Sequence, residues 1–180
     1  MPEHARDKPL EIWFQDETCV GQQGTLTRLW AKRGSRPRAP RDLRHEWAYI
    51  FGAVCPARRA TADVLPYANS EAFSLHLAEI GKEVASEAHA ILILDGAGYH
   101  AAKGLETPDN ISLLRLPSYS PELNPMENVW EYLRKNKLAI TVYNDYDHIV
   151  DKSCEAWNFF AEDKAAVGSI TSRDWAEVRL

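Results

Sequence analysis

Three acidic residues stand next to segments whose composition predicts regular secondary structure. Asp16 follows a β-forming segment, Asp95 follows a run of five apolar residues, and Glu127 lies in the first turn of an expected helix. Carboxylates that converge on one point repel one another unless a cation lies between them. Hard oxygen ligands prefer Mg²⁺ or Mn²⁺, so the three acids predict a catalytic site for two such ions. Two such ions about 3.5–4 Å apart can activate a nucleophile and stabilise a leaving oxygen in phosphodiester chemistry. On this hypothesis Asp16 would bridge the two ions, and Asp95 and Glu127 would each bind one.

Each of these acids also has an ordinary structural explanation. Asp16 can simply end a strand, and the dipeptide Asp95-Gly96 is a common turn sequence. Glu127 lies three residues after Asn124, which is the capping-box position at the start of a helix. No single acid decides between the two interpretations, so the prediction depends on the three occurring together.

The elements that must position the acids follow from the hydrophobic patterning. Strands are expected over residues 10–15, 25–32, 45–54, 90–94 and 110–116, with a further short strand over 61–66. Helices are expected over residues 70–84, 124–138 and 146–160, before a C-terminal tail or short helix. Asn124 is the expected cap of the second helix, with Pro125 in its first position.

This order of elements predicts an α/β fold. Three sequential strands favour an antiparallel meander, and the later strand–helix–strand segment favours a parallel crossover. We therefore expect a mixed five-stranded sheet, three antiparallel strands plus parallel strands, flanked by helices. Asp95 would then lie at the carboxyl edge of a buried strand, where ligands bind in open α/β sheets. Residues 1–9 are expected to form a flexible lead-in, and residues 10–180 one catalytic domain.

Composition limits the class of protein. The 180 residues are 45 % apolar, which suits one domain with a real core. No stretch approaches the ~20 apolar residues of a membrane span, and no apolar run follows the charged N-terminus as in a signal peptide. The three cysteines are widely separated and form no Cys-x-x-Cys pair, which disfavours a zinc knuckle or a disulfide framework. A cytoplasmic protein without a membrane partner is expected.

The positive charge is concentrated near the N-terminus. The net charge is −5, yet residues 1–60 contain 11 Lys and Arg against 7 Asp and Glu. One interpretation is a solvated, positively charged hairpin and loop, and the other is a surface that contacts phosphates. On the second interpretation the DNA-binding candidates are Arg28, Lys32, Arg33, Arg36 and Arg38, joined by Lys135 on the helix that carries Glu127. A solvated helix end is the alternative for Lys135.

Three longer segments resemble the catalytic blocks of DDE transposases. They are WFQDE (13–17), LILDGAGYH (92–100) and LPSYSPELNPMENVW (116–130), and the third is the most specific. The resemblance is to the bacterial insertion-sequence branch of the Tc/mariner superfamily, the IS-six-thirty group. Segments 24–37 and 172–176 also look like this family, so the resemblance runs from about residue 10 to residue 176.

The resemblance implies a ribonuclease-H-like fold and a triad of Asp16, Asp95 and Glu127. Glu122 falls in the loop before the helix and matches no catalytic position. The implied activity is metal-dependent cleavage of double-stranded DNA at the element ends, followed by strand transfer into target DNA. Slightly fewer residues separate Asp95 from Glu127 than is usual in the family, which we interpret as a shortened loop.

The resemblance also implies partners. The family carries an N-terminal helix-turn-helix that nothing in residues 1–9 replaces, so an upstream reading frame or a fusion is expected to supply it. Family members act as dimers on paired DNA ends, and a preference for TA target sites is implied.

Several side chains have two possible roles. His100, five residues after Asp95, either touches the scissile phosphate or positions water, or it is an ordinary polar residue of the following turn. Trp13, Trp30 and Trp47 fall in expected strands and are expected in the core rather than stacked on bases.

Three functions compete with an active transposase domain. One is a nuclease of the same fold that cuts without joining. Another is a silent remnant that binds DNA or full-length transposase and so regulates transposition. The last is an α/β protein unrelated to nucleic acid, which the length of the third block disfavours.

Overall fold

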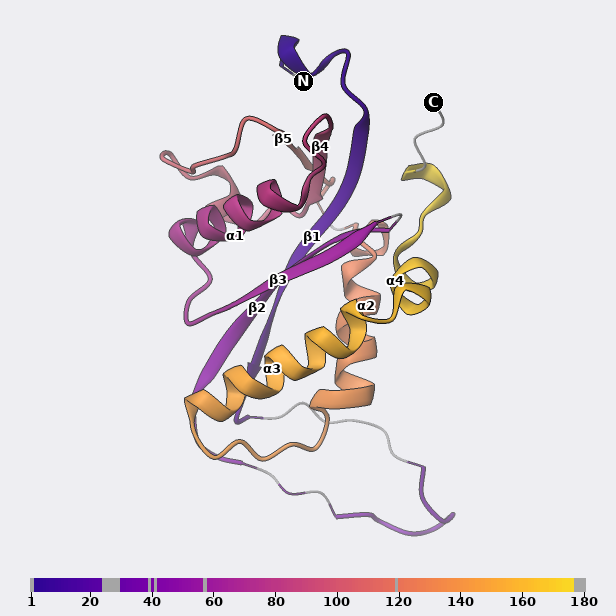
Figure 1. Cartoon of the computed structure of the whole chain (residues 1–180). Helices are drawn as coiled ribbons and strands as arrows, with labels where there is room; N and C mark the ends of the chain where they lie inside the picture. The colour runs from indigo at the N-terminus through magenta and orange to yellow at the C-terminus, as the bar shows by residue number, and fades with distance from the viewer. Residues whose placement is uncertain are drawn as a thin grey trace.

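The computed structural model describes residues 2–23, 30–38, 40, 42–56, 58–118 and 120–176. These residues form a five-stranded sheet in the order β3-β2-β1-β4-β5 (Figure 1). Its strands are β1 (Leu10–Gly21), β2 (Trp47–Cys55), β3 (Arg59–Leu65), β4 (His89–Leu94) and β5 (Ile111–Arg115).

The sheet is mixed, as the sequence predicts. β1, β2 and β3 pair antiparallel, with Asp16 of β1 opposite Gly52 of β2. β4 and β5 are parallel to β1, and Phe14 of β1 pairs with Ile93 of β4. This register brings the carboxyl end of β4 beside the middle of β1, so Asp95 and Asp16 approach one another.

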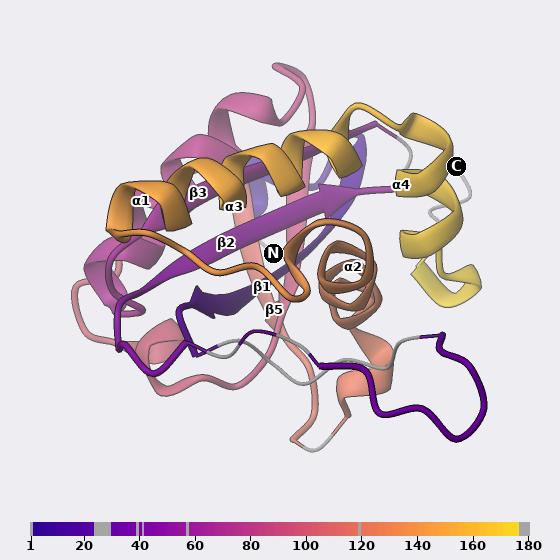
Figure 2. The ribbon, with the colours of Figure 1, turned by 90° about the horizontal axis from the view of Figure 1, so that it is seen from below.

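Helices cover both faces of the sheet (Figures 1 and 2). One face packs against α1 (Ser70–Glu83) through an apolar cluster that includes Trp13, Phe73 and Leu92. The other face packs against α2 (Met126–Leu133), α3 (Tyr146–Ala161) and α4 (Lys164–Thr171) through a cluster that includes Phe14 and Trp130. Side chains alternate along β1, so Trp13 and Phe14 enter opposite clusters.

Side-chain caps fix where the longer helices begin. Asn69 accepts a 2.9 Å hydrogen bond from the Ala72 amide at the start of α1. Asp145 accepts one of 2.8 Å from the His148 amide at the start of α3. Such a cap satisfies one of the free amides of a first turn and stabilises a helix by about 1 kcal/mol.

The meander differs in detail from the expectation. Residues 25–29 of the predicted strand 25–32 lie outside the described residues, and residues 30–32 are not in a strand, so that part of the prediction is wrong. The short strand expected over 61–66 is the third strand of the meander, β3. β1 continues to Gly21, so Asp16 lies in the middle of a strand and not at its end.

The helix expected over 124–138 is shorter than predicted. α2 begins at Met126, and Pro125 occupies the cap position. Residues Arg134–Leu138 (η4) form a π-helical segment. Asn124 still bonds the Met126 amide through its side chain, at 3.1 Å, although it stands one residue before the cap.

Two of the three tryptophans expected in the core are not there. Trp13 is fully buried, but Trp30 is fully exposed and Trp47 is 47 % exposed. Trp30 lies outside any strand, and Trp47 is the first residue of β2, where packing against the sheet is incomplete. Across the described part of the chain, the helices are all too short or too polar to cross a membrane.

Candidate active site

The site is centred on Asp16, in the middle of β1. Its carboxylate is half-buried, and Oδ2 accepts a 2.8 Å hydrogen bond from Nε1 of Trp130 on α2. Gly52 lies opposite on β2, and a Cβ there would stand 2.7 Å from the rings of both Trp130 and Trp157. The absence of a side chain at Gly52 therefore makes room for the indole that holds Asp16.

Asn124 holds the start of α2 against β1. Its side chain is 5 % exposed, and Nδ2 donates a 2.9 Å hydrogen bond to the backbone oxygen of Gln15. Oδ1 accepts from the Met126 amide, so one amide group joins the strand before Asp16 to the helix that carries Glu127. Glu127 is exposed in the first turn of that helix.

Asp95 follows β4 directly and is exposed. Its Oδ1 accepts a 2.9 Å hydrogen bond from the Ala97 amide and lies 3.1 Å from Nδ1 of His100. The turn after β4 therefore folds back on the carboxylate.

The three acids line one cleft of about 350 Å³. They come from a strand, a strand end and a helix start, and the remaining walls are formed by segments 116–118 and 120–121 with Gly96 and Asn124. The structure thus brings together Asp16, Asp95 and Glu127, whereas Glu122 does not line the cleft.

Burial and the closeness of other carboxylates raise the pKa values of acids at the cleft. Burial raises the pKa of Asp16 to about 6, the Trp130 hydrogen bond opposes the shift, and the charges of Glu127 and Asp95 add to it. Burial also raises the pKa of Glu17 to about 8, with further contributions from Asp16 and Asp95. A divalent cation would relieve this repulsion.

The candidate ligands in the cleft are carboxylate oxygens, which are the ligands that hard divalent cations prefer. Within the described ranges, no three His, Cys, Asp or Glu side chains are gathered closely enough to hold a metal ion as they stand. Glu127 is exposed in the first turn of α2, so its side chain can turn toward Asp16, as binding of an ion between them would require.

His100 lies beside the cleft without opening into it. Its side chain is 1 % exposed, and burial lowers its pKa. Nε2 lies 3.8 Å from Oε2 of Glu17. Sequence patterning does not reveal the roles of Trp130, Asn124 and Glu17 at the site, although all three lie within the blocks that carry the acids.

The predicted DNA-binding residues are not brought to the acids. Lys32, Arg33, Arg36 and Arg38 are exposed on segment 30–38, which loops beyond the ends of β1 and β2 (Figures 1 and 2). Arg28 lies outside the described residues. Lys135 forms a 2.6 Å ion pair with Glu131, which lies one turn earlier on α2.

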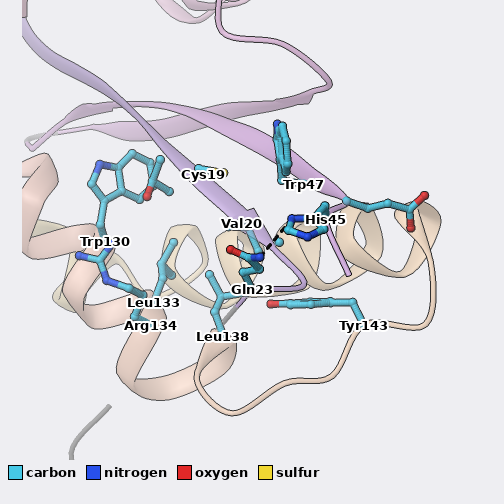
Figure 3. Close-up of a pocket in the computed structure, with 13 residues that line it drawn as sticks. Cys19, Val20, Gln23, His45, Trp47, Trp130, Leu133, Arg134, Leu138 and Tyr143 are labelled. Carbon is cyan, nitrogen blue, oxygen red and sulfur yellow. Dashed lines mark hydrogen bonds between the residues drawn. The ribbon is translucent and has the colours of Figure 1, made fainter. Parts of the chain in front are cut away.

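A second cleft of about 310 Å³ lies between the adjacent ends of β1 and β2 and the end of α2 (Figure 3). Its lining includes Val20, Trp47, Leu133 and Tyr143, and none of the three acids. It shares Trp130 with the acidic site, because this indole lines the second cleft while its Nε1 bonds Asp16.

Fold and cleft together define a ribonuclease-H-like α/β domain with an acidic centre. Residues 11–149 match the family described as DDE superfamily endonuclease. The chain belongs to this family. It is also 53 % identical over 131 residues to the uncharacterized protein y4pE/y4sA of Sinorhizobium fredii, covering 72 % of this chain and 97 % of that one.

Solved structures of Mos1 mariner transposase share the fold. The strand transfer complex superposes with a TM-score of 0.65 at 17 % identity, covering 89 % of this chain and 50 % of that chain. The Mos1 catalytic domain gives a TM-score of 0.61 at 16 % identity, covering 89 % of this chain and 74 % of that one. The chain thus spans about half the length of the Mos1 chain in the strand transfer complex.

Proposed function

We propose that this chain is the catalytic domain of a transposase from the insertion-sequence branch of the Tc/mariner superfamily. It would cleave DNA phosphodiesters and transfer the resulting strand end to a target. The observation that carries the proposal is the cleft shared by Asp16, Asp95 and Glu127, in a chain of the DDE endonuclease family.

The roles of the residues follow from their surroundings. Asp16 is held by Trp130 and lies within reach of the charges of the other two acids, so it would bridge two ions, with Asp95 and Glu127 each binding one. Mg²⁺ or Mn²⁺ held there would supply activation of the attacking oxygen and stabilisation of the leaving oxygen. Support for this cation choice comes from the oxygen donors and from Mos1 paired end complexes solved with Mn and with Mg.

The partners belong to the same proposal. Double-stranded DNA is the substrate, and the Mos1 relatives include strand transfer and paired end complexes. We propose that end recognition requires a helix-turn-helix segment beside this domain and that the domain works as a homodimer on DNA. Lys32, Arg33, Arg36, Arg38 and Lys135, with Arg28, are the proposed phosphate contacts.

A nicking assay tests the proposal. The purified chain is expected to nick supercoiled plasmid with Mg²⁺ or Mn²⁺ and to lose this activity in EDTA. Asp95→Asn and Glu127→Gln should reduce nicking to background, whereas Glu122→Gln, which removes a nearby carboxylate outside the cleft, should not. Equal nicking by wild type and Asp95→Asn would show that this site does not carry out the nicking.

Strand transfer needs a separate assay. DNA with pre-cut 3′-hydroxyl ends is incubated with a target plasmid, and joined products are counted. Joining supports the transposase assignment, and nicking without joining indicates a nuclease. A folded protein that neither nicks nor joins but binds DNA would favour the regulatory remnant.

A further inference from the structure

His100 is a buried imidazole with no direct route to DNA. It lies in the 3₁₀ turn η2 (Gly98–Ala101), shortly after Asp95, and its side chain is 1 % exposed. Its ring packs against Phe73 of α1 and against Tyr99, with centroid distances of 4.4 and 4.6 Å. Arg115 of β5 donates a 2.9 Å hydrogen bond to its backbone oxygen. Ring and backbone are therefore both held in place.

The ring is turned toward Asp95. Nδ1 lies 3.1 Å from Oδ1 of Asp95 and 3.3 Å from the Asp95 backbone oxygen. A carbonyl oxygen can only accept, so Nδ1 must carry the proton and donate. The Ala97 amide donates to the same Oδ1 at 2.9 Å. Nδ1 of His100 and the Ala97 amide thus both approach Oδ1 of the carboxylate, and among the described residues no hydrogen bond to the other oxygen, Oδ2, is formed.

The opposite nitrogen faces the other acidic segment. Nε2 is buried and has no hydrogen-bond partner within the described part of the chain. It lies 3.8 Å from Oε2 of Glu17, the neighbour of Asp16 on β1. The imidazole therefore stands between the turn that carries Asp95 and the strand that carries Asp16.

We propose that His100 is a positioning residue that orients the Asp95 carboxylate so that Oδ2 is presented to a divalent cation in the cleft. The inference rests on the proposed function, because it assigns Asp95 as a ligand. A residue that hydrogen-bonds a metal ligand in this way fixes the direction of its lone pairs and strengthens binding. Because His100 is 1 % exposed, we assign it this role through Asp95 in place of a direct contact with a phosphate.

Two substitutions separate positioning from packing. His100→Phe keeps an aromatic ring between Phe73 and Tyr99 but removes the donor to Asp95. His100→Asn places an amide nitrogen near the position of Nδ1 but gives up most of the ring. If His100 acts through Asp95, the Asn variant retains cation binding and the Phe variant loses it. If its role is only packing, the order is the reverse.

The measurement is Mn²⁺ affinity of the full chain, by isothermal titration or by the electron paramagnetic resonance of free Mn²⁺, beside thermal unfolding. We expect His100→Phe to weaken Mn²⁺ binding about 10–100-fold, the range typical for loss of a group that orients a ligand. His100→Asn should bind Mn²⁺ more tightly than His100→Phe while unfolding at a lower temperature. Mn²⁺ binding by His100→Phe as tight as by His100→Asn would overturn the proposal.

An Asp95→Asn variant distinguishes failure of this inference from failure of the proposed function. Weak Mn²⁺ binding by Asp95→Asn together with unchanged binding by His100→Phe would overturn the role of His100 alone. Equal Mn²⁺ binding by wild type and Asp95→Asn, or none by wild type, would overturn the metal assignment of the cleft and with it the role of His100.

Discussion

Nε1 of Trp130 donates a 2.8 Å hydrogen bond to Oδ2 of Asp16, which joins α2 to the middle of β1 at the acidic cleft. Trp130 lies three residues after Glu127, and its ring is buried against Trp157 of α3. One side chain therefore anchors the helix that carries one acid to the carboxylate of another. A hydrogen bond to an ionised carboxylate contributes about 1.5–3 kcal/mol and favours the charged form.

Replacing Trp130 by Phe is expected to reduce DNA nicking about tenfold or more, because Asp16 loses the indole donor that favours its charged form. Loss of this donor raises the pKa of Asp16 further above about 6, so less of the carboxylate is ionised at a given pH. The acid limb of the pH–rate profile should therefore move to higher pH. Initial nicking rates measured across the acid limb and into the alkaline range at saturating Mn²⁺ check this.

The control for Trp130→Phe is the substitution Trp157→Phe. It removes an indole from the same cluster, but Trp157 makes no hydrogen bond to Asp16 that the structure describes. Both variants should lower the unfolding temperature, and only Trp130→Phe should move the acid limb. If the acid limb of the pH–rate profile moves equally in Trp130→Phe and Trp157→Phe, the effect is due to packing and not to the hydrogen bond.

Substitution of Gly52 by Ala is expected to destabilise the fold by about 1–3 kcal/mol, the usual cost of overpacking a core. A Cβ at this position would lie 2.7 Å from ring atoms of both Trp130 and Trp157, which are locked in the cluster between sheet and helices. The displaced indole should also release Asp16, so nicking should fall together with stability. Chemical denaturation and nicking rates measure the two effects.

Gly168 provides the matched control for Gly52. It lies within α4, and a Cβ there would meet no atom within 4 Å. Gly168→Ala should stabilise the protein by about 0.5–1 kcal/mol, because alanine loses less backbone entropy in a helix. Equal stability of Gly52→Ala and wild type would show that the two indoles can move aside.

Sequence patterning predicts some features of the fold and site and misses others. The mixed sheet flanked by helices follows from patterning, because buried strands such as 90–94 and helical spacing are local properties. The strand order β3-β2-β1-β4-β5 does not. The three acids are grouped through their joint occurrence and the resemblance of the segments around them. The extension of β1 beyond Asp16 does not follow, since residues 15–18 are all polar and the pairing of β1 with β2 is a long-range property. The exposure of Trp47 is missed for the same reason.

The side chains that support the acids are also invisible to local patterning. Asn124 is a cap by its residue type, but its 2.9 Å bond to the Gln15 backbone joins positions far apart in the chain. Sequence alone allows His100 to be either a phosphate contact or a turn residue, and only the fold shows that its ring is buried against Phe73. Partners that come from another element cannot be deduced from spacing alone.

Without a divalent cation, the protein is expected to lose stability as the pH rises from about 4 to about 8. The pKa values of Asp16 and Glu17 are raised in the folded state, to about 6 and about 8, above their ordinary values of 3.8 and 4.5. The folded protein therefore binds more protons than the unfolded chain in this range, and unfolding free energy falls with pH. Thermal unfolding in EDTA across this range measures the slope.

Glu17→Gln should remove most of the slope above about pH 6 and raise the unfolding free energy at about pH 8 by about 1–3 kcal/mol. A glutamine side chain can still accept the hydrogen bond that Gln15 donates to Glu17. Glu122→Gln removes an exposed carboxylate outside the cleft and should leave the slope unchanged. A wild-type stability that rises with pH over the same range in EDTA would contradict the burial of Glu17.

Segment 30–38 carries several exposed basic side chains. If Arg33, Arg36 and Arg38 contact phosphates, their replacement by Ala should weaken DNA binding and reduce the dependence of binding on salt. The slope of log affinity against log salt should fall by about 0.9 for each phosphate that the variant can no longer neutralise. Fluorescence anisotropy with labelled duplex DNA, measured from low to moderate salt, gives both quantities.

Lys82 is the charge control for this segment, because it is exposed on α1, on the sheet face opposite α2. Lys82→Ala removes a positive charge and should leave the slope unchanged. Lys135→Ala tests the predicted DNA-binding residue on α2. Lys135 already forms an ion pair with Glu131, which gives it a structural role that does not require DNA. A slope that is the same in the triple variant as in Lys82→Ala would identify segment 30–38 as a solvated loop, because charges that displace no counterions make no phosphate contacts.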